Sequence, residues 1–272
     1  MFHAAAFVTS VCIMKNLALI LIVFLGATVS ARAELHTQSI EYKQGDTVLE
    51  GFLAYDKNIQ GKRPGVIIVH QWKGLGPYEK KRAEMLAGLG YTVFAVDIYG
   101  KGIRADNPKD ASVLATKYKS DRPLLRERAK AGLAVLRKHE MTDPWHVAAI
   151  GYCFGGTTVL ELARSRADLD GVVSFHGALG AAEPKDAQPI KCKVLALHGA
   201  DDPFVPTAEV GGFEEEMRQA KADWQLVSYG GAVHSFTDWN AGSDNSKGAA
   251  YNEKADKRSW EAMKNFFAEI FR

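Results

Sequence analysis

The chain lacks an excess of charge of either sign. It carries 34 lysines and arginines against 32 aspartates and glutamates in 272 residues. Two of the basic residues, Lys15 and Arg32, lie in an N-terminal segment that we expect to be removed, so the remainder carries 32 of each sign. A chain without net charge presents no electrostatic footprint for nucleic acid. We therefore expect no nucleic-acid partner.

The chain also lacks an apolar run long enough to span a membrane comfortably, which takes about 20 residues. Its N-terminal run, residues 17–29, has 13. Lys15 precedes this run and the small-residue pattern A-R-A, ending at Ala33, follows it, as in a secretory signal peptide. We interpret residues 1–33 as a signal peptide and residues 34–272 as one mature domain. The mature protein is then periplasmic or secreted, with no stable membrane partner.

Other interpretations of this segment stay open. Cleavage after Ala31 also fits the small-residue pattern. Met14 stands directly before the basic residue and is a more regular start, which would make residues 1–13 a mis-assigned beginning. An uncleaved segment would instead anchor the chain to a membrane.

Cysteine is scarce, with three residues in the chain. Cys12 falls in the signal segment, which leaves Cys153 and Cys192 in a compartment that permits disulfides. Cys192 precedes one predicted strand and Cys153 follows another, so a parallel sheet separates them by roughly 15–20 Å at about 3.3 Å per residue. A disulfide needs Cα atoms within about 7 Å. We therefore expect Cys153 to be a free thiol that is open to oxidation.

Several sequence patterns are missing as well. No internal repeat, low-complexity tract, long linker or nucleotide-binding glycine pattern occurs in the mature chain, so we expect one domain and no cofactor. His70, His176 and His198 each end a predicted strand, but the chain has no H-x-H or H-E-x-x-H spacing of the kind that binds metal. We expect no metal, and expect these histidines to order loops beside the site.

What is present is an alternation of short apolar runs with longer helical stretches. Runs such as GVIIVH and TVFAVD are almost continuously apolar, which is typical of strands covered on both faces in a parallel sheet. The first two strands are expected to pair as a hairpin through Gly45-Asp46. Pro123 and Pro144 are expected to mark boundaries between elements.

The pattern predicts an α/β domain with a mostly parallel, eight-stranded sheet and helices on both faces. Predicted strands are residues 36–43, 47–54, 65–70, 92–97, 146–150, 171–175, 193–198 and 224–229, and predicted helices are residues 77–89, 108–120, 123–139, 156–166, 207–220 and 253–271.

The sharpest motif is G-Y-C-F-G-G at residues 151–156, between a predicted strand and a predicted helix. This is the nucleophile-elbow pattern, with Cys153 where serine is usual. The glycines permit a tight strand-to-helix turn, and the helix N-terminus favours thiolate over thiol. Cys153 is therefore the candidate nucleophile; the alternative is a buried, inert cysteine.

A cysteine nucleophile needs a base and a residue that orients the base, and in this fold they follow in the order nucleophile, acid, histidine. Asp202 follows the strand at 193–198 and His234 follows the strand at 224–229. Asp202 is expected to hold the His234 ring, and His234 to ionise Cys153. Asp201 is the alternative acid. The oxyanion is expected to be held by the main-chain N–H groups of Phe154 and Trp72.

These motifs resemble the dienelactone hydrolase family of the α/β-hydrolase superfamily. G-Y-C-F-G-G, G-A-D-D-P-F-V-P and H-S-F carry the resemblance, which runs from about residue 64 to residue 240. It implies an α/β-hydrolase fold without a large cap domain and the hydrolysis of dienelactones or related esters. It also implies a Cys-His-Asp triad, which Cys153, His234 and Asp202 match by position.

Three residues depart from the family pattern. Gln71 stands where the family has a glutamate that helps to control ionisation of the thiol. The two arginines that hold the substrate carboxylate are matched by Lys101 and Asp238, and an acid at the second position would repel a carboxylate. We therefore expect a small ester or lactone other than dienelactone as the substrate.

The candidate substrate pocket is expected to be formed by polar and aromatic side chains that follow strands. The candidate pocket residues are Gln71, Tyr99, Lys101, Phe204, Phe236 and Trp239.

Two other functions stay open. One is the hydrolysis of another acyl bond, such as a thioester or peptide bond, and the other is ligand binding without catalysis on the same fold. The oligomeric state is unknown.

Overall fold

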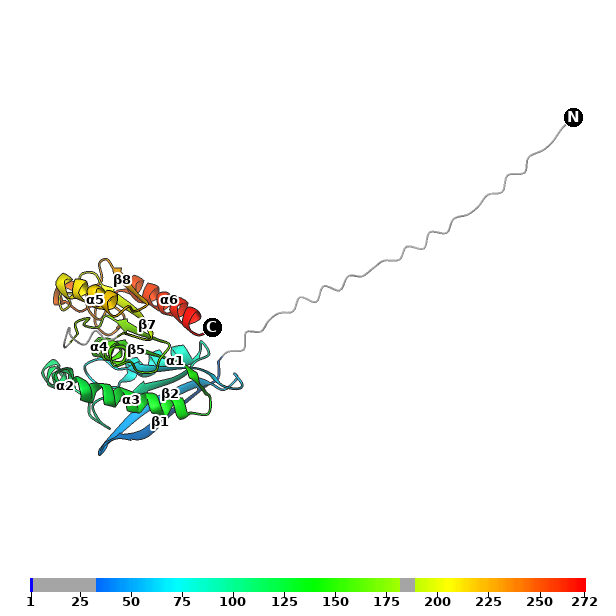
Figure 1. Ribbon diagram of the computed structural model, residues 1–272, viewed down its shortest axis with the longest axis horizontal. Helices are drawn as coiled ribbons and strands as arrows, with labels where there is room; N and C mark the ends of the chain where they lie inside the picture. The colour runs from blue at the N-terminus through cyan, green and yellow to red at the C-terminus, as the bar shows by residue number, and fades with distance from the viewer. Residues whose placement is uncertain (2–32, 182–188) are drawn as a thin grey trace. The chain divides into compact units, whose positions relative to one another are not determined.

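The computed structural model of the protein describes Met1, residues 33–181 and residues 189–272 (Figure 1). Residues 33–272 form one compact unit. The predicted signal peptide and its cleavage sites thus lie almost wholly outside the described residues. Among the described residues, no helix is long and apolar enough to cross a membrane.

The described residues form one eight-stranded sheet with the strand order β1-β2-β4-β3-β5-β6-β7-β8. β1 and β2 pair as the predicted hairpin, and β2 pairs with β4 antiparallel, whereas the pairs from β4 to β8 are parallel. The prediction of a mostly parallel sheet is confirmed. The strands are β1 (Leu35–Gln44), β2 (Thr47–Asp56), β3 (Arg63–Val69), β4 (Thr92–Val96), β5 (Thr142–Tyr152), β6 (Gly171–Phe175), β7 (Lys193–Gly199) and β8 (Trp224–Tyr229).

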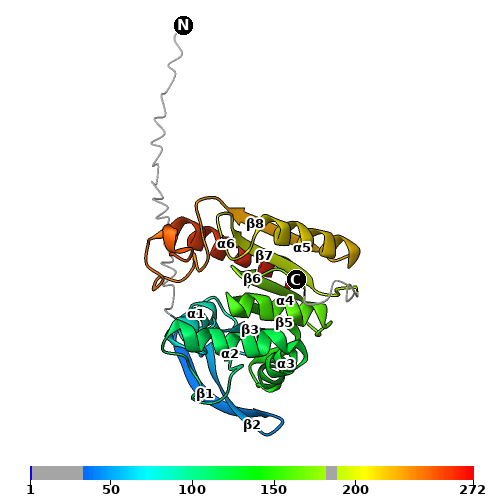
Figure 2. The ribbon, with the colours of Figure 1, turned by 90° about the vertical axis from the view of Figure 1, so that its left-hand side faces the viewer.

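Helices cover both faces of this sheet (Figure 2). In the described residues, the connections between strands contain only these helices and loops, so no separate cap domain is present there. The helices are α1 (Pro77–Ala87), α2 (Pro108–Ser120), α3 (Arg122–Lys138), α4 (Phe154–Arg164), α5 (Thr207–Gln219) and α6 (Glu253–Ile270), with a short 3-10 helix, η2 (Asn245–Lys247).

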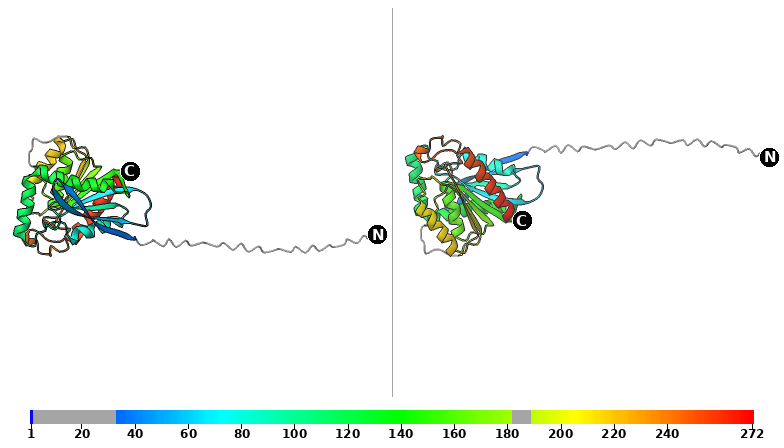
Figure 3. Two further views of the ribbon diagram at one scale, coloured as in Figure 1. Left: turned by 90° about the horizontal axis from the view of Figure 1, so that it is seen from below. Right: turned by 90° about the horizontal axis from the view of Figure 1, so that it is seen from above.

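The period of two along each strand decides which helices each side chain meets. In β3, Ile67 and Val69 pack in the cluster that contains residues of α2, α3, α4 and α5. Val66 and Ile68 point the other way, into the cluster with α1 and α6. Figure 3 shows this division, with α6 in red on one side of the sheet and α3 in green on the other. Both faces are apolar because both are covered.

One predicted boundary is wrong. Pro144 is predicted to precede the strand, but it lies inside β5, which begins at Thr142. The pairing of β3 with β5 shifts register between Pro64 and Gly65, so Pro144 occupies an irregular part of the strand. Proline is tolerated at such bulges because its missing N–H interrupts no regular ladder there.

Candidate active site

The proposed nucleophile sits in a strained turn. Cys153 links β5 to α4 with φ 53°, a backbone conformation that residues other than glycine rarely adopt. A Cβ on Gly151 would collide with the main chain of Gly155, and a Cβ on Gly155 would collide with the carbonyl of Val69. The turn is therefore closed against β3, and glycine is required on both sides of the cysteine.

His234 reaches this turn from the loop after β8. Its main chain is fixed on both sides, since its N–H donates to the Gly248 carbonyl and its carbonyl accepts from the Ala250 N–H. Its Nε2 lies 3.1 Å from Cys153 Sγ, within hydrogen-bond distance. Two side chains 81 residues apart in the chain are thus in contact.

Asp202 orients the histidine ring. Its Oδ2 lies 2.8 Å from His234 Nδ1, and its Oδ1 accepts from the Phe204 N–H. Because both carboxylate oxygens have partners and the side chain is fully buried, the carboxylate is held in one position. The alternative acid, Asp201, is exposed and accepts from the Gly231 N–H instead.

Cys153 and His234 shift each other's pKa, and Asp202 contributes to the shift of the His234 pKa. Burial alone would raise the pKa of Cys153, but the charge and hydrogen bond of His234, the Phe154 N–H and the charge of Lys119 lower it overall. Burial alone would lower the pKa of His234, yet Cys153 and Asp202 raise it to about 10. Opposite charges in contact favour each other's ionised form. The contact therefore favours the thiolate and imidazolium forms over the neutral pair.

The second cysteine, Cys192, differs from Cys153 in the direction in which its surroundings shift its pKa. Cys192 is buried, and desolvation raises its pKa to about 12. Both described cysteines are free, as predicted. Cys192 thus provides an internal reference thiol without thiolate character.

The loop after β3 carries the expected oxyanion donor, and buried polar groups order it. His70 lies 2.6 Å from the Gln71 carbonyl through Nδ1 and accepts from the Ile98 N–H through Nε2. The tautomer that satisfies both contacts has its proton on Nδ1. Glu79, which no sequence motif singles out, accepts from the Gln71 N–H and the Gly76 N–H. The expected ordering role of His70 agrees with these contacts.

Two of the departures from the family pattern contact each other. Gln71 Nε2 donates to Asp238 Oδ2 at 2.9 Å, which joins the loop after β3 to the loop that follows His234. Asp238 also accepts from the Asn240 N–H. An amide at position 71 and an acid at position 238 therefore form a complementary pair.

Three other candidate pocket residues lie close to Cys153 and His234 or to the loops around them. Phe204 is 58% exposed, and its ring stands edge-on to His234 at 5.5 Å between centroids. Trp239 is partly exposed, and packs on Tyr78 and over the Arg82 guanidinium. The Tyr99 hydroxyl donates to the Trp72 carbonyl, and burial together with the charge of Cys153 raises the pKa of that hydroxyl.

Two pocket assignments are corrected by the structure. Phe236 is fully buried and packs against His176 and Tyr229, so it belongs to the core below the site. Lys101 is exposed and pairs with Glu41 of β1. Neither assignment could be judged from the sequence, because a residue that follows a strand can point outward, inward or along the surface.

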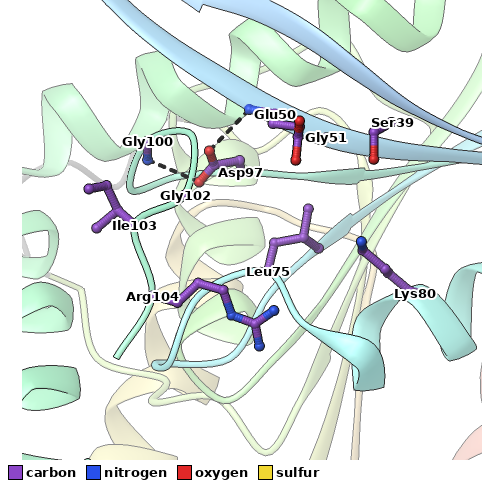
Figure 4. A pocket seen from close by; sticks show the side chains of 10 residues that line it. All are labelled: Ser39, Glu50, Gly51, Leu75, Lys80, Asp97, Gly100, Gly102, Ile103 and Arg104. Carbon is purple, nitrogen blue, oxygen red and sulfur yellow. Dashed lines mark hydrogen bonds between the residues drawn. The ribbon is translucent and has the colours of Figure 1, made fainter. Parts of the chain in front are cut away.

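A small cavity of about 100 Å³ lies beside the loop after β4 (Figure 4). Leu75, Lys80 and Arg104 line it, and Asp97 at its wall accepts from the Glu50 and Gly100 N–H groups. Cys153, His234 and Asp202 are not among its lining residues. We therefore do not assign this cavity to the candidate active site.

Comparison with known proteins identifies the family of the chain. The sequence model described as "Dienelactone hydrolase family" matches residues 49–271, which include the elbow, the acid and the histidine. The chain belongs to the dienelactone hydrolase family. Membership makes it a hydrolase of the dienelactone hydrolase type.

Two relatives are similar to this chain over most of its length. A putative carboxymethylenebutenolidase of Aquifex aeolicus is 28% identical over 235 residues, which are 85% of this chain and 97% of that protein. The protein usf of Aquifex pyrophilus is 31% identical over 204 residues, which are 73% and 86% of the two chains.

Solved structures agree with the fold. A dienelactone hydrolase-like promiscuous phosphotriesterase from metagenomic libraries superposes with a TM-score of 0.83 at 41% identity, and covers 87% of this chain and 98% of its own. A putative dienelactone hydrolase from Klebsiella pneumoniae gives 0.74 at 23% identity, over 86% and 99% of the chains. The latter comparison supports the fold alone.

Proposed function

We propose that the protein hydrolyses ester or lactone bonds through an acyl-enzyme on Cys153, with His234 as the acid and base and Asp202 as its orienting partner. The observation that carries the proposal is the continuous line of contacts from Asp202 Oδ2 through the His234 ring to Cys153 Sγ, at 2.8 and 3.1 Å. A nucleophile, a base and an orienter within hydrogen-bond reach are the arrangement required for covalent acyl transfer.

The first half of the reaction forms the thioester. The Cys153 thiolate adds to the substrate carbonyl carbon, and the resulting oxyanion is held by the N–H of Phe154 and, as we propose, by that of Trp72. When the tetrahedral species collapses, the C–O bond breaks and the imidazolium of His234 gives its proton to the leaving alkoxide. In a lactone this alkoxide stays attached to the acyl group.

The second half releases the acid. Neutral His234 takes a proton from water, the hydroxide adds to the thioester carbonyl, and the C–S bond breaks. The thiolate leaves and again faces a protonated histidine, which restores the resting pair. Asp202 keeps Nδ1 protonated throughout, and so directs Nε2 at the reacting atoms.

The preferred substrate is proposed to be a neutral ester with an apolar group near the scissile bond. The exposed Phe204 ring beside His234 offers an apolar surface at the site. The basic residue at position 101 is held by Glu41 rather than free for a carboxylate, and position 238 is acidic. Because a phosphotriesterase is among the similar structures, an aryl phosphotriester is a second substrate to test.

Trapping the acyl-enzyme tests this proposal. A p-nitrophenyl ester with a slowly hydrolysed acyl group is expected to give a burst of p-nitrophenol and one acyl mass added to the protein. Peptide mapping should place the acyl group on Cys153. A Cys192→Ala variant serves as the matched control and should be labelled equally. Turnover without any adduct on Cys153, or an adduct on another residue, would contradict the mechanism.

The ion pair predicts how alkylation of Cys153 depends on pH. Contact with His234 lowers the pKa of the thiol, and contact with Cys153 and Asp202 raises the pKa of His234 to about 10. The rate of iodoacetamide labelling should therefore fall with acid at a lower pH than it does for an ordinary thiol. In His234→Ala the midpoint should move upward, toward an ordinary thiol. Equal midpoints in the two proteins would show that no such pair exists.

We also propose that residues 1–33 direct export, on the basis of the basic, apolar and A-R-A pattern. The mature protein recovered from the periplasm or medium should begin at Glu34. N-terminal sequencing that finds the segment intact would favour the anchored alternative.

A further inference from the structure

Beneath the nucleophile lies a second histidine that makes two directed contacts. His176 follows β6, is fully buried, and has φ 40°. Its Nδ1 lies 3.1 Å from the main-chain nitrogen of Cys153, and its Nε2 lies 2.7 Å from Thr237 Oγ1. The first contact belongs to the turn of the nucleophile, and the second to the loop that carries His234.

The donors and acceptors fix the tautomer of this ring. The Cys153 N–H can only donate, and it is shared between His176 Nδ1 and the Phe175 carbonyl. Nδ1 must therefore be unprotonated, so that Nε2 carries the proton and donates to Thr237 Oγ1. A ring protonated on both nitrogens would lose the contact with the nucleophile turn.

The surroundings keep this ring neutral. Burial, the charge of His234 and the charge of Arg82 hold the pKa of His176 well below its usual range. The His234 ring lies edge-on at 5.4 Å between centroids, and Tyr152 and Phe236 pack on other sides. The packing and the nearby positive charges thus favour one orientation and the neutral form of the His176 ring.

Thr237 is itself firmly held, so it can act as an anchor. Its hydroxyl lies 2.6 Å from the Tyr78 hydroxyl, and its carbonyl accepts from Arg82 Nη2 at 2.9 Å. Arg82 is buried and forms an ion pair with Asp256 at 2.5 Å. The anchor therefore connects the loop of His234 to α1 and α6 through charge-assisted bonds, which are the strong ones.

We propose that His176 is a positioning residue that ties the turn of Cys153 to the loop of His234 through Thr237, and thereby fixes the contact between Sγ and Nε2. The proposal rests on the proposed function. Its physical basis is that both segments have irregular backbone. Cys153 has φ 53°, and Ser235, in the loop of His234, has φ 57°. Without a tie, each segment could relax separately, and small misplacements of catalytic groups are costly.

The test is Thr237→Val, which keeps the shape of the side chain and removes the acceptor for His176. We expect kcat to fall by on the order of tenfold to a hundredfold, with KM little changed. Iodoacetamide labelling of Cys153 at pH 7 should slow by about tenfold, because a loosened His234 contact raises the pKa of the thiol. Thr237→Ser, which restores the hydroxyl, should recover both rates.

Controls separate positioning from general destabilisation. Thr92 is an equally buried threonine whose hydroxyl donates to the Met141 carbonyl, away from the elbow. Thr92→Val should lower thermal stability while labelling of Cys153 stays at the wild-type rate. A Thr237→Val protein with wild-type kcat and labelling profile, whatever its stability, overturns the proposal.

Failure of the proposed function gives a different result. Labelling reports the contact of Cys153 with His234 without any turnover. If esters were not hydrolysed by wild type, the labelling change in Thr237→Val would still test the tie. If esters were hydrolysed but Cys153 formed no adduct, the mechanism would fail on its own evidence.

Discussion

Replacing Cys153 by alanine is expected to lower kcat/KM for p-nitrophenyl esters by roughly 10⁴- to 10⁶-fold, the range found when a nucleophile is removed from a triad. The loss is large because alanine offers no atom to bond the substrate carbon, so that only substrate binding and the N–H donors still accelerate the reaction over water. Steady-state rates at substrate concentrations well below KM provide the measurement.

Cys153→Ser and Cys192→Ala are the informative companions of this variant. Serine keeps a nucleophilic atom in a slightly smaller side chain but not the ionisation, since no thiolate can pair with the imidazolium, so activity should stay far below wild type. Cys192→Ala should hydrolyse esters at the wild-type rate, because the Cys192 thiol is buried and its pKa is raised to about 12. Equal activity of wild type and Cys153→Ala would end the case for a cysteine nucleophile.

Asp202→Asn is expected to reduce kcat on the order of 10⁴-fold, as in serine hydrolases whose orienting acid is amidated. An amide can offer its NH₂ to His234 Nδ1, which favours the tautomer with the proton on Nε2. That tautomer cannot accept a proton from water or from a thiol. The positive charge on His234 would also lose the carboxylate that now lies 2.8 Å from Nδ1.

The neighbouring acid supplies a matched control for this result. Asp201→Asn changes the same charge one residue away, at a carboxylate that accepts from the exposed Gly231 N–H. Its kcat should remain within about threefold of wild type, as for surface substitutions away from special features. Wild-type activity in Asp202→Asn together with a large loss in Asp201→Asn would assign the role to Asp201.

The local sequence was sufficient to predict the elements of the fold. Burial on both faces makes β3, β4, β6 and β7 nearly continuous apolar runs, and such runs can be recognised directly in the amino-acid sequence. The boundary at Pro144 was the exception, because a proline inside a bulged strand looks the same in sequence as a proline in a turn.

Only part of the candidate site could be predicted, because the sequence shows which residues follow strands but not which side chains meet in the core. Cys153, Asp202 and His234 each follow a strand, and the carboxyl ends of parallel strands meet at one edge. The partners Glu79, His176 and Thr237 could not be deduced in this way. Their contacts depend on side-chain direction in the folded core, and no short motif encodes it.

The sequence by itself determined the alternation of strands and helices and the elbow, because these follow from local steric demands and from apolar periodicity, and it placed the candidate nucleophile, acid and base each after a strand. Only the tertiary structure decided that Asp202 rather than Asp201 contacts His234, that Phe236 is core and Lys101 is paired at the surface, and that His176 contacts two strained segments at once. Those outcomes depend on distances between residues far apart in the chain, which are fixed when the helices close over both faces of the sheet.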